Sequence, residues 1–223
     1  MDQASASAHK DEPVDYAAVG ATQAGDLMQY PPEGFTPFTA DIRLGSGAER
    51  FESATAALFG WSAQRDAGIR VADVHVPPDE RYLGIHFDEA GIPLEQVKPA
   101  MEQRFSADGT PFVTSGMTVV LDGEVEGQQL SSVSRVVLVV EEPRTAGFAL
   151  GTLVSEHSSG EESFMLEHRE DDSVWFVYRT FQRPLSRALR WPPLLMRRRF
   201  RVISTAYLRA MSPAWSTGSG DRA

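Results

Sequence analysis

The 223-residue chain contains no cysteine. This absence excludes a disulfide framework, a thiolate metal site and a cysteine nucleophile. Its five histidines are scattered along the sequence and form no HExxH or two-histidine–one-carboxylate pattern. We therefore expect neither a bound metal nor a cofactor.

The sequence also lacks the short motifs that mark common enzyme classes. There is no G-x-S-x-G turn of a serine hydrolase and no glycine fingerprint of a dinucleotide-binding fold. Gly147 and Gly151 are not followed by the Lys-Ser/Thr pair of a phosphate-binding loop, so we expect them to permit a bend in a sheet. With no recognisable catalytic motif, the sequence leaves open whether the chain is an enzyme.

Long apolar runs are missing as well. The best candidate, residues 136–140, is far shorter than the roughly 18 apolar residues needed to cross a bilayer. The first dozen residues are polar and carry neither the basic region nor the apolar stretch of a secretory signal. We expect a cytoplasmic protein without a transmembrane segment.

Charge is abundant but unevenly distributed. The net charge is −10, yet residues 1–178 hold 11 basic and 30 acidic residues, whereas residues 179–211 hold nine arginines and no acid. The acidic average argues against a nucleic-acid or an anionic-membrane partner. The basic segment is the most unusual feature of the chain.

The hydrophobic pattern predicts an α+β domain. Alternating and β-branched residues predict strands at 35–44, 68–76, 117–121, 130–142, 147–154, 163–168 and 174–181. Helical periodicity predicts helices at 48–60 and from Pro193 to about Met211, with a shorter helix at 184–190. A strand at 81–87 and a helix at 93–105 are weaker expectations. Short strands at this spacing indicate one curved antiparallel sheet.

Two local signals sharpen these boundaries. Ser46 and Glu49 have the spacing of a capping box, which would start the first helix. Asp122-Gly123 predicts the turn between two central strands. We expect a single domain over 15–211, between disordered tails at 1–14 and 212–223.

Several segments resemble a known family. They are Val19-Gly-Ala-Thr22, the segment from Gly147 to Leu153, the segment from His157 to Phe164, and Val174-Trp-Phe176. In this order they are similar to the DUF1990 (UPF0548) family of uncharacterised bacterial and plant proteins. The resemblance implies that 77–111 is an insertion, and it supplies no activity.

The order of elements also resembles the helix-grip (START/Bet v 1-like) architecture. In that fold a curved antiparallel sheet wraps a long C-terminal helix, with a short helix near the N-terminus. The resemblance implies a cavity between sheet and helix that holds a hydrophobic or amphipathic small molecule. Its wall would comprise Phe148, Leu150, Phe164, Phe176, Tyr178, Phe200, Ile203 and Tyr207.

An alternative function is enzymatic. His157, Glu161 and Glu162 are predicted in or beside a Ser/Gly-rich loop, and a histidine with carboxylates can transfer protons. The same residues also fit a solvated turn whose acidic side chains protect a sheet edge.

A third interpretation concerns the arginines of the last helix. Arg197, Arg198 and Arg201 could bind phosphates of an anionic lipid surface or, less favoured, of nucleic acid, because guanidinium groups pair bidentately with phosphate. Alternatively, they could neutralise acidic residues of the same chain.

Overall fold

The computed structural model describes residues 6–77, 104–106, 109–155, 157–185 and 193–212. The strand expected at 81–87, almost all of the helix expected at 93–105 and most of the helix expected at 184–190 lie outside the described residues.

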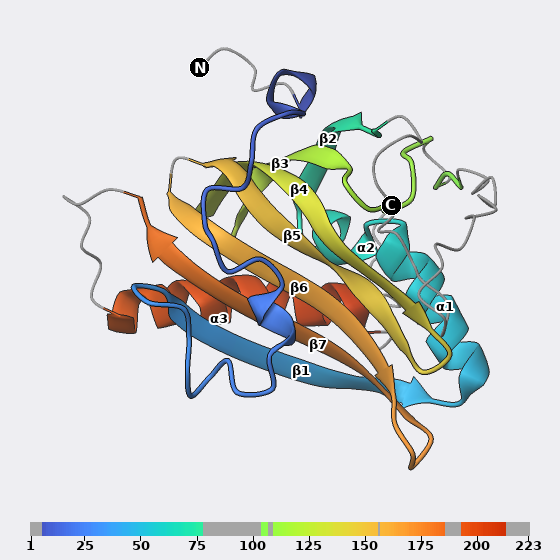
Figure 1. The fold of residues 1–223 in the computed structure, drawn as a ribbon. Coiled ribbons are helices and arrows are strands. Elements are labelled where there is room, and N and C mark those ends of the chain that lie inside the picture. The colour runs from blue at the N-terminus through green and yellow to red at the C-terminus, as the bar shows by residue number, and fades with distance from the viewer. Residues whose placement is uncertain (1–5, 78–103, 107–108, 156, 186–192, 213–223) are drawn as a thin grey trace, which may run out of the picture.

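Within the described residues, seven strands form one antiparallel sheet in the order β1-β7-β6-β5-β4-β3-β2. The strands are β1 (Thr36–Ser46), β2 (Ile69–His75), β3 (Thr118–Val125), β4 (Gln128–Glu142), β5 (Thr145–Ser155), β6 (Ser158–His168) and β7 (Ser173–Pro184). The sheet is strongly curved (Figure 1). Pro37, which has no N–H for a ladder hydrogen bond, lies on β1 at the sheet edge, where a strand tolerates proline.

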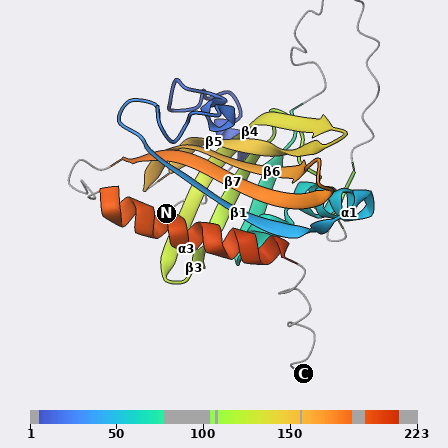
Figure 2. The ribbon, with the colours of Figure 1, turned by 90° about the horizontal axis from the view of Figure 1, so that it is seen from below.

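The helices complete the expected architecture. Helices α1 (Ala48–Phe59) and α2 (Ser62–Arg65) follow β1, and α3 (Pro193–Met211) lies across the concave face of the sheet (Figures 1 and 2). Two short 3-10 turns, η1 (Ala6–His9) and η2 (Ala21–Gln23), lie in the N-terminal segment. This arrangement confirms the predicted helix-grip-like α+β fold.

Helix α3 packs against the sheet through one apolar face. The inward residues are spaced three or four apart and are at most 5% exposed: Met196, Phe200, Ile203, Tyr207 and Met211. The helix begins at Pro193, where a missing N–H costs nothing. Burial of these large side chains against the sheet holds α3 in place.

Aromatic rings fill much of the space between the sheet and the helices. The ring of Phe148 lies 5.5 Å from Trp61 and 5.2 Å from Phe164, measured between centroids. Tyr207 of α3 continues the cluster, 5.1 Å from Phe164 and 5.4 Å from Tyr178. This part of the concave face is solid core.

The N-terminal segment covers the outer face of β5, β6 and β7 (Figure 1). Tyr16 and Leu27 pack against Phe181, which is fully buried although it points away from α3. Both faces of the sheet are therefore covered at β7. This explains why β7 carries buried aromatic residues on its inner face, such as Tyr178, and on its outer face, such as Phe181.

The described part of the expected tail 1–14 also makes specific contacts. The backbone N–H of Ala6 donates to Asp73, and the Arg135 guanidinium donates to the carbonyls of Lys10 and Glu12. This segment is thus hydrogen-bonded to the sheet rather than detached from it.

Three local predictions were wrong. Ser46 is the last residue of β1, and Gly47 occupies the N-cap of α1 without a side-chain cap, so no capping box forms. Asp122-Gly123 lies inside β3, and the turn comes at Glu126-Gly127, where both residues have positive φ. Strand β6 begins five residues earlier than expected, at Ser158 rather than Ser163.

Gly147 provides a test of how closely the strands approach one another. It has a φ of +154°, and a Cβ there would lie 2.1 Å from the backbone oxygen of Phe164. We predict that Gly147→Ala lowers the free energy of unfolding by about 2–4 kcal/mol, because backbone strain adds to a clash that no rotamer relieves. Urea denaturation measures the change.

Gly127→Ala is the matched control. Gly127 has a φ of +78°, but a methyl group added there would meet no atom within 4 Å, so only the backbone strain of about 1 kcal/mol applies. Equal losses of stability in the two variants would contradict the close approach between the backbones of Gly147 and Phe164.

Candidate functional site

A small polar cavity remains between α3 and one end of the sheet. Its volume is about 50 Å³, enough for a few water molecules. It lies beyond the aromatic cluster and takes residues from every strand except β1. The residues that line it are Ile69, Leu121, Leu130, Ser131, Ser132, Ser134, Leu150, Thr152, Ser155, His157, Ser158, Glu162, Gln182, Arg199, Ile203 and Tyr207.

Glu162 supplies the acidic group of the cavity. It lies on β6 and accepts hydrogen bonds from the Tyr178 hydroxyl and, at 2.5 Å, from Nε2 of Gln182. The Gln182 carbonyl oxygen in turn accepts from Oγ of Ser158 at 2.8 Å. These partners fix the orientation of the Glu162 carboxyl group.

Arg199 supplies the basic group. It comes from α3 and donates from Nη1 to Oε1 of Gln128 at 3.2 Å and from Nη2 to the carbonyl oxygen of Gln129 at 2.8 Å. Both acceptors belong to the start of β4. The guanidinium group is therefore tied to the β3–β4 hairpin.

The two charged groups face the same cavity without forming a contact ion pair. The charge of each group shifts the pKa of the other, yet no ion pair within 4.0 Å joins Arg199 to Glu162. Opposite charges in a poorly hydrated space attract strongly and would close on each other if their side chains were free. Here separate hydrogen-bond partners hold them apart.

Burial shapes the protonation of the site. Loss of hydration raises the pKa of Glu162, while the hydrogen bonds from Tyr178 and Gln182 and the charge of Arg199 oppose that rise. Burial lowers the pKa of Arg199, and Glu162 opposes the fall. Burial also raises the pKa of Tyr207, which remains a neutral hydroxyl at physiological pH.

The residues expected to form the cavity wall divide into two groups. Leu150, Ile203 and Tyr207 line the cavity. The other five lie in the solid core, each at most 1% exposed: Phe148, Phe164, Phe176, Tyr178 and Phe200. The cavity is consequently smaller and more polar than a space lined by all eight would be.

Glu161 lies on the opposite face of β6 from Glu162. The expected loop position of both residues was wrong, because they belong to β6 and successive strand residues point to opposite faces. Glu161 is fully buried, and its carboxylate accepts from the Tyr16 hydroxyl at 2.7 Å and the Gly20 N–H at 2.8 Å. It also accepts from the N–H of Thr22 at 3.1 Å and its hydroxyl at 2.5 Å. Glu161 fastens the N-terminal segment to the sheet.

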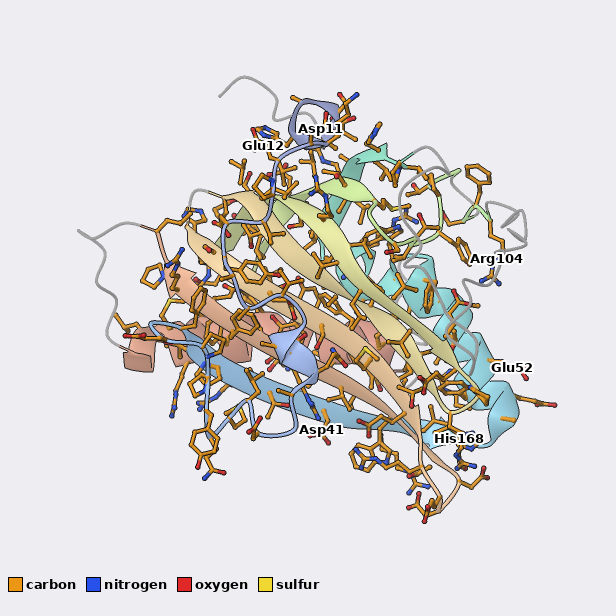
Figure 3. The ribbon with its side chains drawn as sticks, viewed as in Figure 1. Asp11, Glu12, Asp41, Glu52, Arg104 and His168 are labelled. Carbon is orange, nitrogen blue, oxygen red and sulfur yellow. The ribbon has the colours of Figure 1, made fainter. Side chains whose placement is uncertain are left out.

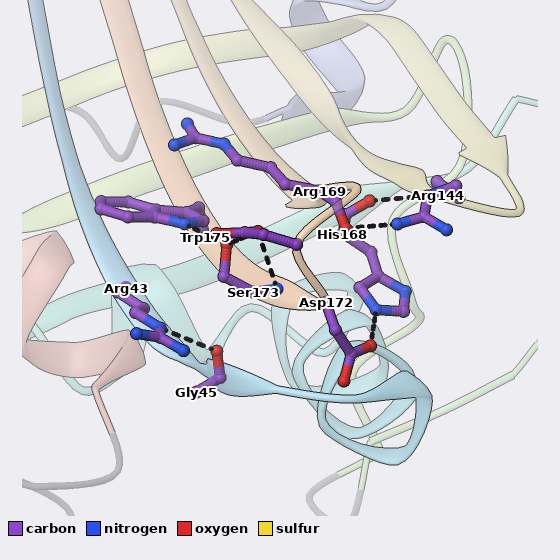
Figure 4. Close-up of polar contacts among 9 residues, drawn as sticks. Arg43, Gly45, Arg144, His168, Arg169, Asp172, Ser173 and Trp175 are labelled. Atoms are coloured by element: carbon purple, nitrogen blue, oxygen red, sulfur yellow. Dashed lines mark hydrogen bonds and ion pairs between the residues drawn. The ribbon is translucent and has the colours of Figure 1, made fainter.

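The histidines also occupy separate places. His157 lies in the β5–β6 turn, is exposed and lines the cavity mouth. His168 ends β6, stacks on Phe51 and hydrogen-bonds Asp172 at 2.7 Å (Figure 4). Arg144 donates to the carbonyls of His168 and Arg169 in the same hairpin. These contacts secure the β6–β7 hairpin rather than the cavity.

Sequence reasoning missed Gln182 and Arg199 as cavity residues, although periodicity could have found both. Gln182 has the same strand parity as Tyr178, and Arg199 lies three residues after Met196 on the flank of the inward face. The expected anion-binding residues Arg197, Arg198 and Arg201 are exposed on α3 and do not line the cavity.

Metal-ligand clusters and membrane-spanning helices are both missing from the described residues. Among them, no three histidine, aspartate or glutamate side chains gather closely enough to hold a metal ion. In the same part of the chain, no helix combines the length and apolarity that a bilayer crossing requires.

We predict that Glu161→Gln destabilises the protein by about 2–4 kcal/mol, measured by urea denaturation. The new amide NH₂ would face two donors, and at least one of the backbone N–H groups of Gly20 and Thr22 would lose its acceptor. Glu170→Gln, at an exposed position, is the control. A change below about 0.5 kcal/mol in Glu161→Gln would contradict the fastening role.

The raised pKa of Glu162 makes a second prediction. Because its folded pKa exceeds the unfolded value, the native state binds this proton more tightly. The contribution of Glu162 to stability therefore falls as pH rises from the unfolded pKa through the folded pKa. Arg199→Gln removes the cation that opposes the shift, so we expect the pKa of Glu162 to rise further.

Carboxyl-carbon NMR titration measures that pKa directly. Arg209→Gln removes another α3 arginine, one that pairs with Glu126 and does not line the cavity, and should leave the Glu162 pKa unchanged. An unaltered Glu162 pKa in Arg199→Gln would show that the charge of Arg199 does not act on Glu162.

Comparisons with solved structures find similar folds at low identity. A START superfamily protein from Mycobacterium smegmatis is 13% identical, with a TM-score of 0.42 over 77% of this chain and 94% of that protein. The Zhui aromatase/cyclase from Streptomyces sp. R1128 is 11% identical, with a TM-score of 0.47 over 83% of this chain and 98% of that protein. Such likenesses carry no information about ligand or activity.

Sequence comparison is more specific. A UPF0548 protein from Deinococcus radiodurans is 37% identical over 89 residues, which are 35% of this chain and 45% of that relative. The match thus spans less than half of the relative's length. The family described as "Domain of unknown function (DUF1990)" matches residues 15–97 and 86–210. Together these segments span most of the chain and confirm the resemblance seen in the sequence: the chain belongs to the DUF1990 family.

Proposed function

We propose that the protein binds a small amphipathic molecule whose oxygen-bearing head lies between Glu162 and Arg199. One observation carries this proposal: two opposite charges share a cavity but are held apart by separate partners. A ligand oxygen placed between them would accept from the guanidinium and share a hydrogen bond with the Glu162 carboxyl group. The site is organised before the ligand arrives.

The cavity wall supports an amphipathic rather than a purely polar ligand. Five aliphatic side chains line it: Ile69, Leu121, Leu130, Leu150 and Ile203. Its volume of about 50 Å³ accommodates a head group of a few atoms. In this proposal the remainder of the molecule follows the aliphatic wall and leaves through the mouth beside His157, and the protein works in the cytoplasm.

A second candidate is acid–base catalysis on the molecule so bound. The observation that favours it is that His157 and Glu162 line one cavity, whereas Glu161 lies on the other face of the sheet. Burial raises the pKa of Glu162, so its carboxyl group would keep a proton to higher pH than an exposed glutamate. Loss of turnover without loss of binding in Glu162→Gln would support catalysis over binding alone.

Calorimetric titration with octanoic acid, octanol and octylamine tests the binding proposal. We predict that the two oxygen-bearing heads bind about tenfold or more tightly than octylamine. Arg199 donates to oxygen and repels an ammonium group, while the raised pKa of Glu162 reduces the negative charge that would attract an ammonium and repel octanoate. Arg199→Gln should weaken octanoic acid binding by about tenfold or more.

Arg209→Gln is again the control, because it removes a charge from the same helix outside the cavity. Leu150→Trp fills the cavity from β5 and should abolish binding in a chain that still unfolds cooperatively. Undiminished octanoic acid binding in both Arg199→Gln and Leu150→Trp would overturn the assignment of the site.

A further inference from the structure

Three arginines cluster within about one turn on the outward face of α3. Arg197, Arg198 and Arg201 are exposed, and residues 193–211 contain five arginines and no acidic residue. The opposite face of the same helix packs into the core. In Figure 2, α3 lies along the outside of the molecule with one side away from the sheet.

These three arginines are not neutralised within the described part of the chain. There, none of their side chains makes a hydrogen bond or ion pair, whereas Arg199 is bonded to β4 and Arg209 pairs with Glu126. Pairing with the acidic body, one of the alternatives raised by the sequence, is thus not what the described residues show. The surface keeps its positive potential.

Exposed leucines accompany the basic surface at the mouth of the cavity. Leu195 is 46% exposed and lies one helical turn before the cavity residue Arg199. Leu185 is 43% exposed, and its N–H donates to the carbonyl oxygen of His157, another mouth residue. Apolar side chains beside arginines match the boundary between lipid headgroups and acyl chains.

We propose that this surface, formed by Arg197, Arg198, Arg201, Leu185 and Leu195, docks onto an anionic phospholipid bilayer. Arginine binds lipid phosphate through paired hydrogen bonds, and the leucines enter the interface, which nucleic acid does not offer. Acidic side chains elsewhere, such as the exposed Asp41 and Glu52 (Figure 3), are repelled by the same membrane. Docking through α3 is therefore the favoured orientation, and it brings the cavity mouth to the lipid.

Vesicle flotation tests the proposal with the full chain. We expect binding to phosphatidylcholine vesicles that contain phosphatidylglycerol, and none to phosphatidylcholine alone. Raising the salt from about 0.1 M to about 1 M shortens the screening length from about 10 Å to about 3 Å and should release the protein.

The triple variant R197Q/R198Q/R201Q should lower the partition coefficient by about 100-fold, since each basic residue near an anionic surface contributes roughly a fivefold factor. The control K10Q/R43Q/R70Q removes three exposed positive charges from other surfaces and should retain binding. Leu185→Ser with Leu195→Ser should weaken binding in the wild-type arginine background. Circular dichroism checks that each variant is folded.

Equal loss of binding in the two triple variants would overturn the proposal, as would tighter binding to duplex DNA than to anionic vesicles at the same salt. Unchanged binding after both leucine substitutions would also overturn it. The docking proposal stands apart from the ligand proposal, because R197Q/R198Q/R201Q leaves the cavity residues intact and should bind octanoic acid normally.

Discussion

The packing of α3 against the concave sheet is the interaction on which the rest of the structure depends. It buries Met196, Phe200, Ile203 and Tyr207, and it joins the aromatic cluster of the sheet through Tyr207. The aromatic rings occupy one part of the concave face, and the cavity that Glu162 and Arg199 line lies beside shorter polar residues toward one end of the sheet. The same helix that completes the core therefore also places Arg199 in the cavity and its other arginines in solvent.

The pleat of β6 divides two adjacent glutamates between unlike tasks. Glu161 points outward, where four donors from the N-terminal segment satisfy its carboxylate. Glu162 points inward, where burial raises its pKa and Arg199 faces it without contact. A carboxylate with all its acceptor sites filled stabilises the fold, whereas one that faces an open space opposite a cation is free to bind. Both residues carry the same side chain, so only their positions on opposite faces of β6 give them different roles.

Periodicity made the fold largely predictable. Helix α3 and the central strands followed from apolar spacing. The site was less predictable, because the start of β6 is rich in serine, glycine and glutamate and resembles a loop in sequence. This segment is a strand because it pairs with β7, where Glu161 lies opposite Phe181 and Glu162 lies opposite Thr180. Pairing between strands overrides the low strand propensity of serine, glycine and glutamate, and a single sequence does not reveal which strands pair. The volume of the cavity depends on how far the rings of Phe148 and Phe164 fill the concave face, which composition does not specify.

The central claim is that one ligand contacts Glu162 and Arg199 together. NMR of the 223-residue chain, observing the Glu162 carboxyl carbon and the Arg199 Nε during titration with octanoic acid, tests it most directly. We predict that both resonances move with a single shared dissociation constant, while those of Glu161 and Arg209 stay in place. Saturable binding of octanoic acid that leaves the Glu162 and Arg199 resonances unmoved would contradict it.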